Sequence, residues 1–275
     1  MYTDTHTHTN FSSDGRMAPE EAVLAAIEKN LSGIAFTDHF DYDYPGNNNE
    51  FRYSFEEYFN KIVPLKEKYA GKFNVYTAVE VGFQPHVYNE VYEIINKYEF
   101  DYIIGSTHAI NHVDPYSGTF FNGRTKEETY LEYIKEVYKN VMMYDNYDTM
   151  GHFDYHIRYA TMFEDRTFYY DDYSDYMDEI FKHIISKNIA LEVNTSTYQK
   201  VPVDKKNLIR YKELGGEMVT IGSDAHCTSD IARIFDETLP IIKECGFDYV
   251  VHFEKRKPVF DKIILWQLKP YILKY

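Results

Sequence analysis

Two histidines near the start of the chain, His6 and His8, have the spacing of a metal-binding pair. They lie in Met1–Asn10, where threonine occupies every second position between Thr3 and Thr9, as suits a β-strand. Residues i and i+2 of a strand point to the same side, so both imidazoles should project together. The pair therefore predicts metal-dependent chemistry, with the rest of the chain bringing further ligands to it.

Other residues of ligand type stand at the ends of short apolar runs. They are His39, Glu80, His108, His152, Asp224 and His226. Taken singly, each would be explained as a hydrogen-bonded histidine or a solvated acid, but their recurrence at successive strand ends favours a shared metal site. Cys227 is not counted, because its side chain should point away from that of His226. The remaining five histidines are assigned surface or structural roles: His86, His112, His156, His183 and His252.

Histidine and carboxylate ligands without cysteine suit zinc, manganese or iron. A single tetrahedral ion takes about four ligands. The candidates exceed that number, so we expect two or three divalent ions.

An alternation of apolar runs and amphipathic segments must position these residues. Helices are expected between strands predicted at residues 1–10, 34–37, 74–81, 101–108, 147–153, 189–194 and 218–223. Such alternation is typical of βαβ units and a parallel sheet. Seven strands with few other elements favour a closed α/β barrel, in which the carboxyl ends of all strands meet on one face. Residues 1–275 are expected to form one domain.

Local signals add detail to this pattern. Residues 40–52 are predicted to be a long loop, and Pro64 is predicted to break or kink a helix that Ser54 caps. Ser229 is predicted to cap a helix that runs to about Cys245. Residues 249–253 and the apolar tail 263–268 should pack against the barrel.

Composition narrows the class of partner. The chain has 275 residues and a net charge of −15, which disfavours binding to nucleic acid. Two cysteines are too few for a disulfide framework, and a reducing compartment is expected. Neither a secretion signal nor an apolar run of about 18 residues is visible. We therefore expect a cytoplasmic protein with a small-molecule substrate, no membrane association and an oligomeric state that the sequence leaves open.

In order and context, these residues resemble the PHP (polymerase and histidinol phosphatase) superfamily, specifically its histidinol-phosphatase-like members. The matching motifs are Asp4-Thr5-His6-Thr7-His8, Thr37-Asp38-His39, Glu80, Gly105-Ser106-Thr107-His108, Gly151-His152-Phe153-Asp154, Leu191-Glu192-Val193-Asn194-Thr195-Ser196 and Ser223-Asp224-Ala225-His226. The resemblance implies a distorted (β/α)₇ TIM-like barrel with a site for three ions.

The resemblance also implies how the ligands are shared. The first ion would take His6, His8, Glu80 and Asp224. The second would share Glu80 and add His108 and His152. The third would take Asp14, His39 and His226, although Asp14 alone would be read as a turn residue and the family has either His or Asp there.

The implied reaction is hydrolysis of a phosphate monoester, with L-histidinol phosphate as the best substrate. A hydroxide bridging two ions would attack phosphorus, and Asp224 or His226 would protonate the leaving group. Arg158 is the candidate phosphate clamp, with a surface arginine as the alternative reading, and Asn194 is a further substrate-binding candidate. Relatives commonly carry Arg in the loop after Asn-Thr-Ser. Here Lys200 is the candidate substitute for substrate binding, as a point charge without the fork of Arg, so the substrate is less certain than the reaction.

Two other functions stay open. The same site could hydrolyse another phosphomonoester or a phosphodiester, including short oligonucleotides. A non-catalytic, metal-binding regulatory domain is also conceivable, although the full set of ligands argues against it.

Overall fold

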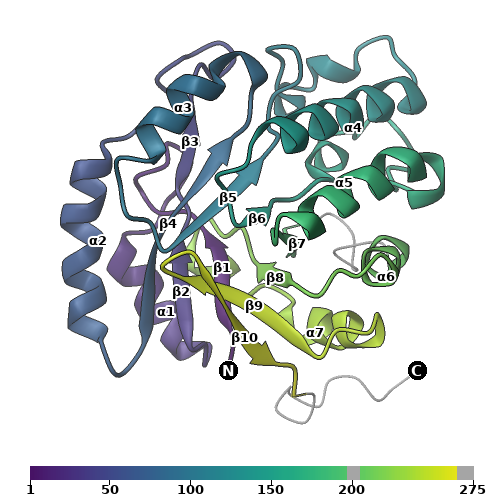
Figure 1. Cartoon of the computed structure of the whole chain (residues 1–275). Helices are drawn as coiled ribbons and strands as arrows, with labels where there is room; N and C mark the ends of the chain where they lie inside the picture. Colours follow the sequence, from purple (N-terminus) through teal and green to yellow (C-terminus); the bar gives the residue numbers. More distant parts are fainter. Residues whose placement is uncertain (197–204, 265–275) are drawn as a thin grey trace.

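The computed structural model describes residues 1–196 and 205–264. Eight strands build the main sheet: β1 (Thr3–Thr7), β2 (Gly33–Phe36), β3 (His39–Asp41), β4 (Asn74–Gly82), β5 (Tyr102–Ser106), β6 (Thr149–Met150), β7 (Ala190–Asn194) and β8 (Val219–Gly222). Seven α-helices surround it in the described residues: α1 (Pro19–Glu28), α2 (Phe55–Tyr69), α3 (Tyr88–Ile95), α4 (Lys126–Met143), α5 (Ser174–Ser186), α6 (Lys205–Glu213) and α7 (Phe235–Glu244). Figure 1 shows these helices ringing the strands.

The sheet is parallel, in the order β1-β2-β4-β5-β6-β7-β8. β3 follows β2 along the same edge of β4, so the two act as one interrupted strand. The first and last strands also meet, because the backbone N–H of His8 donates to Ala225 O and that of Asp224 donates to His6 O, each at 2.8 Å. The predicted α/β barrel is thereby confirmed as a nearly closed barrel.

Side-chain alternation divides the barrel interior into two layers. On β4, Tyr76 and Ala78 belong to an apolar cluster inside the barrel, and Glu80 is the next residue on that face. On β5, Tyr102 and Ile104 lie in the same cluster, and His108 follows beyond the strand end on the same alternation. The apolar layer therefore forms a floor beneath the polar side chains at the carboxyl ends of the strands.

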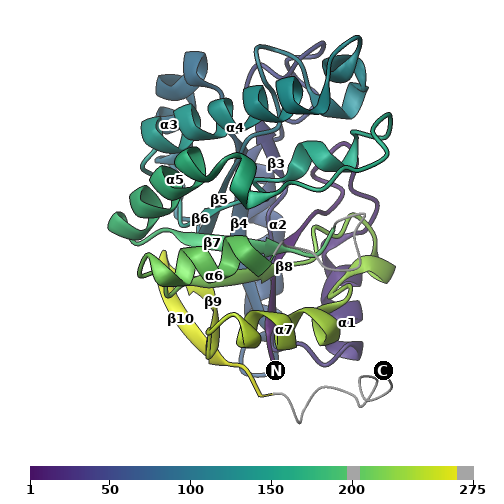
Figure 2. The same cartoon turned by 90° about the vertical axis from the view of Figure 1, so that its right-hand side faces the viewer.

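A C-terminal hairpin closes the amino end of the barrel. β9 (Tyr249–Glu254) and β10 (Lys257–Lys262) pair antiparallel, and β9 contributes Val251 and Phe253 to the interior cluster. The hairpin crosses one end of the barrel in Figure 1 and lies to one side of the strands in Figure 2. With this end sealed, the interior polar residues are reached from the opposite end.

Several sequence-based expectations need correction. The segment predicted as a loop from residue 40 begins with β3, because His39–Asp41 continues the parallel pairing with β4. α2 continues through Pro64, so the predicted break is wrong, and the alternative, a kink, stays a prediction. Ser229 does not cap a long helix: the chain forms a short 3₁₀ helix at Thr228–Asp230, and α7 starts only after the left-handed Ile234 (φ 47°).

The other expectations about the chain ends and strand lengths are partly met. Residues 249–253 pack against the barrel as expected, through Val251 and Phe253, but the hairpin of β9 and β10 was not predicted. Ile263 is buried as expected, whereas residues 265–268 lie outside the described residues. The fifth predicted strand shortens to Thr149–Met150. No helix within residues 1–196 and 205–264 is both long and apolar enough to cross a membrane.

Candidate metal centre and phosphate pocket

The first donor group joins β1, β4 and the segment after β8. His6 Nε2 lies 3.2 Å from Glu80 Oε2, and His8 Nε2 lies 3.1 Å from Asp224 Oδ1. The cross distances are 3.6 Å for His8–Glu80 and 3.7 Å for His6–Asp224. A tetrahedral ion with bonds of about 2.1 Å places its ligand atoms about 3.4 Å apart. The four donors therefore already surround a position of the size that a metal ion needs.

A second group uses the other oxygen of the same carboxylate. Glu80 Oε1 lies 2.9 Å from His152 Nε2 and 3.2 Å from His108 Nε2. Glu80 therefore stands between two donor groups with one oxygen directed to each. This is the arrangement expected of a carboxylate that bridges two ions.

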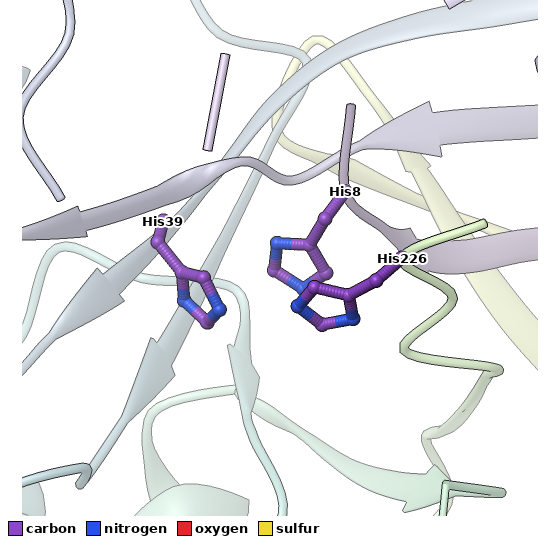
Figure 3. A group of neighbouring side chains, drawn as sticks. All are labelled: His8, His39 and His226. Atoms are coloured by element: carbon purple, nitrogen blue, oxygen red, sulfur yellow. The ribbon is translucent and has the colours of Figure 1, made fainter. Parts of the chain in front are cut away.

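A third group is more open to solvent. Asp14 Oδ2 lies 3.2 Å from His226 Nε2 and 3.6 Å from His39 Nε2. Side-chain exposure is 44% for Asp14 and 30% for His226, against 0% for His6 and Glu80. Figure 3 shows His39 and His226 beside His8, each from a different segment, and the ring of His8 stacks on theirs at 4.1 and 4.2 Å. The third group thus borders the first and faces the pocket.

Three buried atoms of the first group have no hydrogen-bond partner among the described residues: His6 Nε2, His8 Nε2 and Glu80 Oε2. Leaving a buried polar atom unpaired costs about 1–3 kcal/mol. Such atoms are rare in folded proteins, and here they point toward one another. A bound cation would satisfy all three, so the residues present fit divalent metal ions.

Electrostatics support the same conclusion. Burial alone would raise the pKa of Glu80, but His6, His108 and His39 outweigh it and hold that pKa well below its usual range. His6 and Arg158 likewise lower the pKa of Asp224 against the effect of burial. For His6, burial lowers the pKa, yet Glu192, Glu80 and Asp224 raise it well above its ordinary value. The site therefore concentrates ionised carboxylates that attract cations, and metal ions would displace the histidine protons.

Two carboxylates orient the histidines from behind. Glu192 Oε1 lies 2.6 Å from His6 Nδ1, and its Oε2 accepts a hydrogen bond from the backbone N–H of His152 at 2.8 Å. Asp41 Oδ1 lies 2.8 Å from His108 Nδ1. Such partners fix the ring orientation and leave Nε2 available for a metal. These two roles were not predicted: Asp41 ends β3, and Glu192 is the middle residue of β7.

A third buried acid, Asp38, organises the loop after β1. It accepts hydrogen bonds from the backbone N–H and hydroxyl of both Thr9 and Ser12. The hydroxyl of Ser12 in turn lies 3.4 Å from His8 Nδ1. The Thr37-Asp38-His39 motif therefore contributes support from Asp38 as well as a donor from His39.

A cavity of about 620 Å³ opens above the donor groups. Arg16, Arg158 and Arg233 line it together with Asp14, His39 and His226. Farther along the wall, Asp114 accepts hydrogen bonds from Tyr44 at 2.7 Å and from Tyr155 at 3.0 Å. The cavity thus combines donor groups and arginines with an acidic, aromatic wall.

The structure places two of the three predicted substrate-binding residues at this cavity or beside it. Arg158 donates to Asp224 Oδ2 at 2.7 Å and to Asn194 Oδ1 at 3.0 Å, and its side chain is 15% exposed. It is therefore held at the site, which excludes the reading as an ordinary surface arginine. Asn194 is buried at the end of β7. Lys200 lies outside the described residues.

The histidines assigned no metal role are spread over the rest of the molecule. His156 is buried between Tyr130 and Tyr133. His252 pairs with Asp261 in the C-terminal hairpin, and His183 lies in α5. His86 and His112 lie together near the carboxylate of Asp43. The nine predicted metal-ligand residues, in contrast, all belong to the three donor groups.

Comparison with known proteins gives consistent results. Residues 4–196 match the PHP domain. The chain is 38% identical to a "probable histidinol-phosphatase" of Clostridium acetobutylicum, over 93% of this chain and 98% of that protein. It is also similar to the crystal structure of histidinol phosphate phosphatase from Lactococcus lactis, complexed with zinc, L-histidinol and phosphate, with 30% identity, a TM-score of 0.84, and coverage of 95% of this chain and 99% of that one.

A structure from Listeria monocytogenes shares the fold, with 21% identity, a TM-score of 0.72, and coverage of 86% of this chain and 99% of that one. The family match spans well over half of the chain, in agreement with the barrel and the donor groups at its open end. The chain belongs to the PHP domain family.

Proposed function

We propose that this protein is a metal-dependent phosphatase that hydrolyses L-histidinol phosphate. The observation that carries the proposal is Glu80, whose two oxygens face two histidine groups beneath a cavity lined by arginines. The relatives named above support the substrate, since they are histidinol-phosphatases that align over nearly the whole chain. We take residues 1–275 to be one catalytic domain that works on a small phosphorylated metabolite in the cytoplasm.

Two or three divalent ions would be held by the donor groups, with zinc, manganese and iron all compatible with the ligand chemistry. The first two groups share Glu80 and are buried, whereas Asp14, His39 and His226 are partly exposed. We therefore expect the third ion to bind most weakly. When bound, such ions lower the pKa of a water molecule and neutralise phosphate oxygens.

Residues of this chain would orient the phosphate for attack. Arg158 is fixed by Asp224 and Asn194, so its guanidinium is presented to the cavity without a large loss of side-chain freedom. Asn194 links Arg158 to Glu192, because its side-chain nitrogen lies 3.3 Å from Glu192 Oε2. The oxygen of water attacks phosphorus in line, and the bond between phosphorus and the alcohol oxygen breaks.

The leaving alkoxide needs a proton, and the two candidate donors differ. Asp224 is held in its ionised form by His6 and Arg158, which suits a ligand or a proton acceptor. His226 lies at the cavity surface, and Asp14 and Asp224 raise its pKa against the effect of burial. As a ligand of the third ion, however, His226 would give up its Nε2 proton, so it can serve as the acid only while that site holds no ion.

The test is a substrate panel on chelator-treated protein reconstituted with zinc, manganese or iron. We expect L-histidinol phosphate to give the highest kcat/KM, above p-nitrophenyl phosphate and bis(p-nitrophenyl) phosphate, and chelation to abolish phosphate release. A preference for the diester would favour the phosphodiesterase function instead. Failure of every metal-loaded form to release phosphate from either monoester would contradict the proposal.

A further inference from the structure

A second group of metal-ligand side chains lies outside the central site and its cavity. Asp43 lies in the loop after β3, His86 in the 3₁₀ helix Pro85–Val87 after β4, and His112 in the loop after β5. β3 and β5 both pair with β4, so the three loops leave neighbouring strands at the same end of the barrel. The fold therefore brings these residues together for the same reason that it assembles the central site.

The three side chains are close enough to share one ion. His86 Nε2 lies 2.8 Å from Asp43 Oδ2, and the ring centroids of His86 and His112 are 4.4 Å apart. One donor atom from each residue falls within 4.8 Å of the other two. The side chains of His86 and Asp43 are 41% and 32% exposed, so they can move the short distance to ligand positions about 3.4 Å apart.

The backbone on both sides of the group is held in place. Gln84 Nε2 donates to Tyr42 O at 2.7 Å and to Asp43 O at 3.3 Å, which ties the loop of Asp43 to the loop of His86. Ile110 and Val113 exchange two backbone hydrogen bonds of 2.9 Å around Asn111 and His112. The donor groups are thus presented from anchored loops rather than from free ones.

His112 stands at a turn position whose backbone conformation favours glycine over histidine. Asn111 (φ 50°) and His112 (φ 60°) form a two-residue turn with both residues in the left-handed region. In such turns asparagine is favoured at the first position and glycine at the second. The ring of His112 makes no hydrogen bond to another described residue, and its contact is with His86. An ion between the rings would give this side chain a role that glycine could not fill.

We propose that Asp43, His86 and His112 form an accessory site for a divalent transition-metal ion of the zinc class. Two imidazoles and one carboxylate are a ligand set that zinc accepts, with the remaining position left to water. The site is more exposed than the central donor groups, so it should bind more weakly and exchange faster. It is independent of the proposed reaction, since none of its residues lines the cavity.

An ion at this site would join two loops that form the wall of the cavity. Asp43 precedes Tyr44, and His112 stands two residues before Asp114, whose side chain accepts a hydrogen bond from Tyr44 at 2.7 Å. The accessory ion would be the outer link between the loops, and the Tyr44–Asp114 hydrogen bond is the inner one. Metal binding there should stiffen the rim of the cavity.

His112→Gly is the sharpest test, because it removes a ligand while relieving the left-handed backbone. Asn111→Gly is the matched control: it changes the same turn and removes no ligand. Equilibrium dialysis against buffered zinc, followed by elemental analysis, counts bound ions at each free zinc concentration. We expect wild type and Asn111→Gly to bind one more zinc per chain than His112→Gly, with the tightly bound central ions unchanged in all three.

Two further arms distinguish the accessory ion from the exposed third ion of the central site. His86→Gln should lose the same ion as His112→Gly. In an Asp14→Asn background, His112→Gly should still remove one zinc per chain. If His112→Gly and His86→Gln bind as many zinc ions as Asn111→Gly throughout the titration, or if Asn111→Gly also loses the ion, the accessory site is wrong.

Discussion

Replacing Glu192 by glutamine tests whether its carboxylate orients the metal-binding histidines, because glutamine has nearly the same size as glutamate. Glu192 is 1% exposed, and both of its oxygens are used: one lies 2.6 Å from His6 Nδ1, and the other accepts from the backbone N–H of His152 at 2.8 Å. Glutamine has a single acceptor oxygen. If its amide nitrogen faces His6, the ring must carry its proton on Nε2, which then cannot bind a metal. If the amide nitrogen faces His152, two N–H groups meet in a buried place.

Either orientation should weaken the first or the second donor group. Residues that orient metal-binding histidines contribute about ten- to a hundredfold to metal affinity or activity. This corresponds to about 1.4–2.7 kcal/mol. We therefore expect Glu192→Gln to lower zinc affinity by that factor in a chelator competition, and kcat/KM for L-histidinol phosphate to fall at limiting zinc. Excess zinc should restore part of the activity, because Glu192 acts through His6 and His152.

Glu136→Gln is the matched control. Glu136 is also a buried glutamate, at 6% exposure, but it lies in α4 and pairs with Lys139. It should leave zinc affinity unchanged while carrying the same chemical substitution. Wild-type zinc affinity and wild-type kcat/KM in folded Glu192→Gln protein would refute the reasoning that the carboxylate fixes the tautomer of His6.

Three further predictions concern the central site. His6→Ala should abolish turnover and lower the metal content while circular dichroism shows the fold retained, because the apolar floor and the helices do not depend on this ring; unfolding of the variant would contradict this. Asp14→Asn should remove only the weakest ion in a zinc titration, since Asp14 is 44% exposed, and loss of every ion would show that the groups are not separate. Arg158→Lys should lower kcat/KM by about ten- to a hundredfold, because Arg158 contacts Asp224 and Asn194 through two separate nitrogens and lysine has only one; unchanged steady-state kinetics would remove Arg158 from the proposed clamp.

The positions of the donor residues could be predicted because the relevant signal is local. A histidine or glutamate that closes an apolar β run has a known direction, and parallel strands place their carboxyl ends together. His6, Glu80 and Asp224 could therefore be predicted to meet on one face of the barrel, although they are far apart in the sequence. Their grouping into three sets came from the family resemblance, because spacing alone does not say which strand end faces which.

The roles of Glu192 and Asp41 were not predictable in the same way. His6 and Glu192 are 186 residues apart, and nothing near Glu192 marks its partner. Asp41 falls in a segment predicted as a loop, because three residues of strand are too few to produce a clear alternation. The start of α7 was misplaced for a related reason: Ser229 offers a good cap locally, but the left-handed Ala232 and Ile234 postpone the helix.

The division of the barrel interior explains how one chain can hold so many buried charged groups. Tyr102 and Phe253 stack at 5.3 Å in the apolar floor, where the barrel is sealed by the C-terminal hairpin. Above that floor, His6 Nε2, His8 Nε2 and Glu80 Oε2 make no hydrogen bond within the described part of the chain, which destabilises the metal-free protein. The two layers separate stability from chemistry, since the floor and the surrounding helices maintain the fold while the upper layer stays incompletely satisfied. That unsatisfied layer is what gives the site its affinity for cations, so metal binding should stabilise the protein as well as activate it.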